Sequence, residues 1–120
     1  MSPQSLISNE NIRLLGANIT NNIIDGLIII ELPINTPYTT YYAVFWGDSK
    51  GNRLLDLPPL VVSRTGYIRS YALNNLPVPQ NARCFLIYIA TTNTSKVDSD
   101  HIDFDFLSEK KPYVLNLPLR

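Results

Sequence analysis

The residues of this sequence that are best suited to chemistry lie close together in the stretch "DSDHIDFDF". It holds five possible metal-ligating residues, four aspartates and one histidine, at Asp98, Asp100, His101, Asp103 and Asp105. Carboxylate oxygens suit calcium, and a histidine nitrogen beside them would suit zinc. Same-face neighbours along a strand are about 6–7 Å apart, which is too far for one ion unless a loop folds over them. The spacing therefore favours a charged edge strand that resists edge-to-edge pairing, and it predicts no tightly bound metal.

A second polar stretch, "GDSKGN" at residues 47–52, follows the apolar run "YYAVFW". An EF-hand calcium loop needs acids at alternating positions and a distal glutamate, and neither is present. Gly51 can adopt a positive φ, and Asp48 can accept hydrogen bonds from its own turn. The stretch therefore predicts a hairpin loop.

Catalytic motifs find little support in the chain. It has one histidine and one cysteine, far apart in sequence, and no nucleophile elbow, zinc-protease helix or phosphate-binding glycine loop. Cys84 lies in the apolar run "ARCFLIYIA" and is predicted to be a buried thiol. We expect no enzyme and no cofactor, and the acidic segment leaves a small metal-dependent effector or toxin as one alternative.

Tyrosines and arginines supply the candidate binding residues. Tyr38, Tyr41 and Tyr67, if exposed, could stack on sugar rings or anchor a protein contact. The formal net charge is zero, so no global field draws the chain to nucleic acid or an acidic membrane. Opposite charges are nevertheless separated along the chain. A basic patch at Arg53, Arg64 and Arg69 could meet Asp103 and Asp105 of a second copy.

The elements that must position these residues are strands. Prolines and clusters of Asn, Ser and Thr interrupt the chain every ten residues or so, which is typical of short strands joined by turns. The predicted strands are Ile12–Thr20, Leu27–Leu32, Thr40–Trp46, Leu60–Ser63, Tyr67–Leu73, Arg83–Thr91, His101–Leu107 and Tyr113–Leu119. About seven or eight strands predict an all-β, two-sheet antiparallel β-sandwich, and 120 residues fit a single domain over 1–120.

Two predicted strands, Thr40–Trp46 and Arg83–Thr91, are apolar on both faces, which predicts central strands covered on both sides. One core between the sheets should bring together Ile28, Ile30, Val44, Trp46, Tyr71, Leu73, Leu86 and Tyr88.

Three stretches together resemble the fibronectin type III pattern, over roughly residues 23 to 93. "LIIIELP" resembles that family's second strand, and "YYAVFW" resembles its third. "SYALNNLPVPQNARCFLIYIATTN" resembles its fifth and sixth strands, with Leu86, Tyr88 and Ala90 in the sixth. Ile30 stands where the family has a core tryptophan, and Cys84 stands where it has a corner tyrosine.

The stretch "VFWGDSKGNRL" also resembles sandwich repeats of bacterial surface and adhesin-like proteins. These resemblances imply an immunoglobulin-like or fibronectin-like module that binds or scaffolds, since the fold itself implies no activity.

We therefore expect a non-catalytic binding or assembly module that acts through protein contacts, including contacts with its own copies. A carbohydrate-binding module is the first alternative and would need exposed, coplanar aromatic rings. No nucleic-acid partner is expected, because the formal net charge is zero, and no membrane insertion is expected, because apolar runs such as "LIII" are far too short to cross a bilayer. The first residues lack the pattern of a signal peptide, so the chain is expected to be cytoplasmic when made or exported by a signal-independent route.

Overall fold

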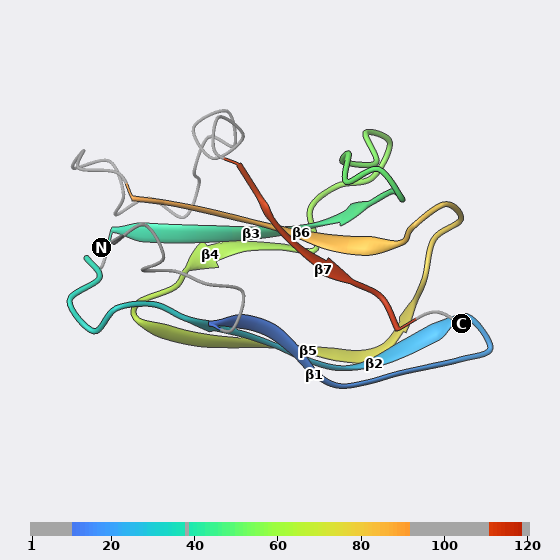
Figure 1. The fold of residues 1–120 in the computed structure, drawn as a ribbon, viewed down its shortest axis with the longest axis horizontal. Coiled ribbons are helices and arrows are strands. Elements are labelled where there is room, and N and C mark those ends of the chain that lie inside the picture. The colour runs from blue at the N-terminus through green and yellow to red at the C-terminus, as the bar shows by residue number, and fades with distance from the viewer. Residues whose placement is uncertain (1–10, 38, 92–110, 119–120) are drawn as a thin grey trace, which may run out of the picture.

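A computed structural model describes residues 11–37, 39–91 and 111–118, which form two antiparallel sheets packed face to face (Figure 1). The strands are β1 (Ile12–Thr20), β2 (Ile23–Glu31), β3 (Thr40–Gly47), β4 (Val61–Arg64), β5 (Ile68–Pro77), β6 (Cys84–Thr91) and β7 (Tyr113–Asn116). One sheet has the order β1-β2-β5 and the other β4-β3-β6-β7. The predicted all-β sandwich is confirmed.

The first hairpin shows how local sequence sets a strand boundary. Asn21 and Asn22 have φ values of 54° and 64°, and Thr20 pairs with Ile23 across them. Asparagine tolerates this left-handed backbone, so two residues suffice to reverse the chain. Strand β2 consequently begins at Ile23, earlier than the predicted start at Leu27.

A core of buried side chains fills the space between the sheets. Ile28, Ile30, Val44, Trp46 and Leu73 lie in it as predicted, each at most 4% exposed. Tyr71 is partly buried and packs against this core.

The prediction was wrong for Leu86 and Tyr88, which lie on the opposite face of their sheet. Strand β6 turns Phe85 and Ile87 inward, opposite Trp46 and Val44 of β3. Because β6 is apolar on both faces, its alternation alone could not decide which set faces the other sheet.

The outer face of the four-stranded sheet carries its own buried cluster. Its members are Tyr41, Ala43, Phe45, Cys84, Leu86, Tyr88 and Ala90. Phe45 and Tyr88 meet edge to face, with ring centroids 5.8 Å apart. Every residue of β3 is buried, so the prediction that this central strand is covered on both sides is confirmed.

Some sequence predictions fall outside this part of the chain. The predicted strand His101–Leu107 lies outside the described residues. The last described strand, β7, ends at Asn116 rather than at the predicted Leu119. Within the described ranges, no helix is long and apolar enough to span a membrane.

Candidate functional site

The loop after β3 is a self-contained turn. Asp48 accepts hydrogen bonds at 2.9 Å from the backbone amides of Lys50 and Asn52, and Gly51 has a φ of 81°. The amide of Gly51 also donates to the carbonyl of Asp48 at 3.0 Å. The hydrogen bonds to the side chain, that from Asn52 first and then that from Lys50, lower the pKa of the Asp48 carboxyl below its ordinary value. The predicted hairpin loop is confirmed, and its carboxylate is engaged by the turn itself.

Cys84 is buried beneath this turn. It is 1% exposed, and its Sγ lies 3.5 Å from the carbonyl oxygen of Asp48. Burial raises the pKa of the thiol, which favours the unreactive protonated form. The predicted buried thiol is confirmed.

Two of the three candidate arginines lie over aromatic rings of the outer cluster. The Cζ atom of Arg53 is 4.9 Å from the ring centroid of Phe45. The Cζ atom of Arg64 is 5.6 Å from the centroid of Tyr41, and its Nε donates to the Tyr41 hydroxyl at 3.1 Å. Cation–π contacts of this kind fix the guanidinium groups against the sheet.

The third arginine, Arg69, serves the contact between the sheets. Its Nη2 donates to Ser63 Oγ at 3.0 Å, from β5 across to β4. Arg69 also lies beside Tyr42, where it opposes the rise in the pKa of that buried phenol. Its side chain therefore points into the gap between the sheets at their open edge.

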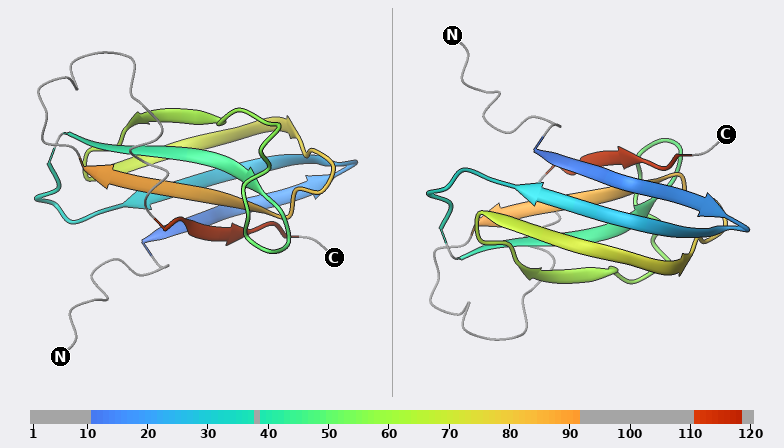
Figure 2. Two further views of the ribbon diagram at one scale, coloured as in Figure 1. Left: turned by 90° about the horizontal axis from the view of Figure 1, so that it is seen from above. Right: turned by 90° about the horizontal axis from the view of Figure 1, so that it is seen from below.

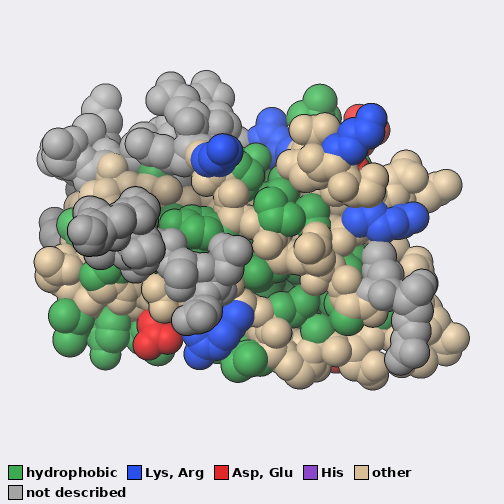
Figure 3. All heavy atoms as spheres, viewed as in Figure 1, with side chains coloured by type: hydrophobic (Ala, Val, Ile, Leu, Met, Phe, Trp, Pro, Cys, Tyr) green, Lys and Arg blue, Asp and Glu red, His purple; other side chains and the backbone are tan. Residues whose placement is uncertain are grey.

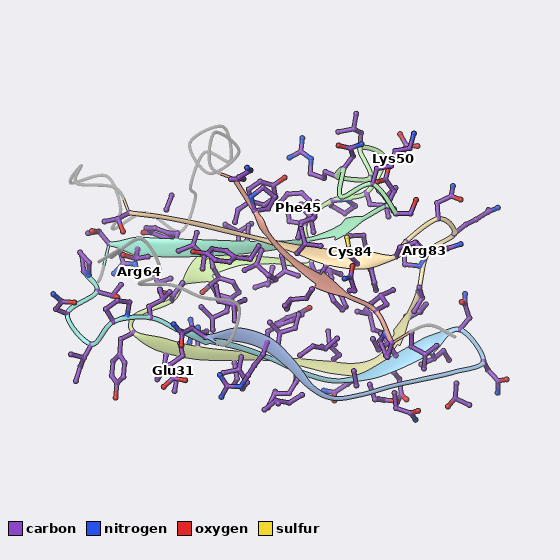
Figure 4. All side chains as sticks on the ribbon, viewed as in Figure 1. Glu31, Phe45, Lys50, Arg64, Arg83 and Cys84 are labelled. Carbon is purple, nitrogen blue, oxygen red and sulfur yellow. The ribbon has the colours of Figure 1, made fainter. Side chains whose placement is uncertain are left out.

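The three arginines do not form one basic patch. Tyr41 and Phe45 are four residues apart on β3, a separation of about 13 Å along a strand. Figure 4 shows Arg64 at the opposite end of the four-stranded sheet from Lys50 and Arg83. The acidic partners expected for such a patch, Asp103 and Asp105, lie outside the described residues.

The candidate tyrosines are also separated in environment. Tyr41 is buried, at 4% exposed, whereas Tyr67 is 46% exposed in the connection between β4 and β5. Tyr38 lies outside the described residues. Tyr41 and Tyr67 therefore do not supply the pair of exposed rings that sugar stacking needs.

The metal candidates cannot be placed in the same way, because Asp98, Asp100, His101, Asp103 and Asp105 all lie outside the described residues. Within residues 11–37, 39–91 and 111–118, no group of three His, Cys, Asp or Glu side chains is arranged to hold a metal ion.

A polar hollow of about 240 Å³ lies between the β3–β4 and β5–β6 connections. Asp48, Ser49, Leu54, Asn81 and Arg83 line it. The Asp48 carboxylate accepts hydrogen bonds from the amides of its own turn, and Arg83 Nη1 donates to the carbonyl of Ala82 at 2.9 Å. Both charged groups of the hollow therefore already have partners in the fold.

The outer side of the three-stranded sheet presents a different surface, seen from below in the right panel of Figure 2. Strand β2 buries Ile28 and Ile30 in the core, so the alternating Leu27 and Ile29 face outward. Across the sheet, Leu27 pairs with Leu15 and with Ala72, and Glu31 pairs with Ile68. We name these outward residues the outer apolar face: Leu15, Leu27, Ile29, Ile68 and Ala72.

Solvent reaches this face. Leu15 is 43% exposed and Ile68 is 54% exposed, Ala72 is exposed, and Leu27 and Ile29 are half-buried by their neighbours. Because a solvated face of an antiparallel sheet is usually polar, an apolar one is a departure that needs a cause.

Polar groups border the outer apolar face at both ends and also flank Ile29, whose cross-strand partners are Arg13 and Ser70. At one end, Arg13 Nη1 lies 3.4 Å from Glu31 Oε1 in an ion pair. Figure 3 shows acidic and basic side chains adjacent along the lower edge of the molecule, where Figure 4 labels Glu31. At the other end, Asp25 accepts a hydrogen bond from the amide of Asn75 at 2.8 Å. An apolar centre with a polar rim is the usual anatomy of a protein interface.

The outer apolar face was not predicted as a site from the sequence, although the sequence contains a pattern that indicates it. "LIII" at residues 27–30 is apolar at consecutive positions, so both faces of the strand had to be apolar. The same pattern identified β3 as a strand covered on both sides. Applied to β2, it would have raised the question of what covers Leu27 and Ile29.

Comparison of the chain with models of known protein families, with curated proteins and with solved structures gave no match. The candidate site therefore rests on the physical properties of the outer apolar face.

Proposed function

We propose that the protein is a non-catalytic binding module that acts through protein contacts. The observation that carries this proposal is the outer apolar face, an apolar surface that the neighbouring described strands leave partly exposed on one side of a β-sandwich. Contiguous exposed apolar surface with a polar rim marks interaction sites, because leaving it in water costs free energy that a partner removes.

The type of module that we propose is a divergent fibronectin-like or immunoglobulin-like sandwich of the kind found in bacterial surface proteins. Its support is the position of the resembling stretches, which fall in β2, β3, β5 and β6, the second, third, fifth and sixth strands of the described chain. The outward direction of Leu86 and Tyr88 in β6 departs from that pattern. The proposed binding activity rests on the surface and does not need this relationship.

A pull-down with matched variants tests the function. The baits are the wild-type chain, Ile68→Lys on the outer apolar face, and Leu55→Lys in the β3–β4 connection, where Leu55 is 79% exposed. We expect proteins bound from an extract of the source cells, further copies of this chain included, to be lost with Ile68→Lys and retained with Leu55→Lys.

The proposed function is contradicted if no bound protein depends on Ile68. A glycan array run on the same three proteins tests the carbohydrate alternative. Specific glycan binding together with unchanged protein capture by Ile68→Lys would move the function to a carbohydrate-binding module.

A further inference from the structure

We draw no further inference here: the strongest candidate, the outer apolar face of the three-stranded sheet, already carries the proposed function, and nothing in the described part of the chain shows which partner covers it.

Discussion

Trp46 of β3 stacks on Phe85 of β6, with ring centroids 4.7 Å apart and planes 28° apart. The two residues are a cross-strand pair on the inner side of the four-stranded sheet, and both belong to the core. Stacked aromatic pairs add to the burial of their own surface. This pair is therefore a large part of what the four-stranded sheet presents to the other sheet.

Trp46→Ala should lower the free energy of unfolding by about 3–5 kcal/mol, because it removes the largest side chain type from a site that is 4% exposed. Urea denaturation followed by circular dichroism measures the loss. Tyr67→Ala, at a ring that is 46% exposed, should change stability by only about 0.5 kcal/mol. Equal losses in the two variants would contradict the packing described for Trp46.

Local features of this fold could be predicted from the sequence, because their causes are local. The Asp48–Gly51 turn follows from a carboxylate and a glycine at suitable spacing, and its bonds form within six residues. Strand positions follow from alternation and from the turn residues between them. These signals do not depend on where the rest of the chain lies.

Features set by pairing between distant segments could not be predicted in the same way. The face that β6 turns inward depends on its register with β3, and both of its faces are apolar. The placement of Arg69 depends on the close approach of Ser63 on another sheet. Long flexible side chains reach partners that sequence spacing does not specify. The sequence therefore could not show whether Arg53, Arg64 and Arg69 lie together in one basic patch.

Gly47 faces Cys84 across the β3–β6 pair, where no side chain has room. A Cβ atom added at Gly47 would lie 2.7 Å from Cys84 Sγ and 2.9 Å from Leu86 Cγ. Gly47→Ala should therefore destabilise the fold by about 1–3 kcal/mol through overpacking. Thermal or urea unfolding measures this cost.

A double-mutant cycle checks its cause. Gly47→Ala should cost less in a Cys84→Ala background by about 0.5 kcal/mol or more, because the nearest clashing atom is absent. Some cost should remain, since Leu86 is unchanged. Additive losses would show that Gly47 is required for another reason.

The Asp48 turn should contribute stability that depends on pH. The lowered pKa of Asp48 means that the folded chain keeps its carboxylate ionised below the ordinary value of 3.8, where the unfolded chain binds a proton. This contribution is complete above that value and is lost as the pH falls through the folded pKa.

Asp48→Asn should therefore be less stable than the wild type near neutral pH, and the difference between the two should shrink in acid. Asp56→Asn, an exposed aspartate in the same connection, is the control for loss of a carboxylate. Urea midpoints measured at neutral and acidic pH make the comparison. A difference that stays constant down to strongly acidic pH would rule out the charge-assisted hydrogen bonds as its source.

Alkaline pH should destabilise the fold through its buried phenols and thiol. Burial raises the pKa of Tyr42, Tyr88 and Tyr113 above the ordinary 10.0, and that of Cys84 above 9.0. Below those ordinary values these groups are protonated in both the folded and the unfolded chain, so they do not reduce the free energy of unfolding. As the pH rises further, the unfolded chain ionises first, so stability falls progressively until the folded pKa values are passed. Urea midpoints should decrease from about pH 9 upward.

Arg69→Gln isolates one contribution to this alkaline loss. Arg69 opposes the raised pKa of Tyr42, so its removal should shift one tyrosine to a still higher pKa in a titration of tyrosinate absorbance. The stability of Arg69→Gln should then keep falling over a wider range of alkaline pH than that of the wild type. The control is Arg83→Gln, which also removes one guanidinium. Arg83 donates to the carbonyl of Ala82 and lies at the opposite end of the sandwich from Arg64 (Figure 4), so its loss should leave the tyrosine titration unchanged. Identical tyrosine titrations in all three proteins would contradict the position of Arg69 beside Tyr42.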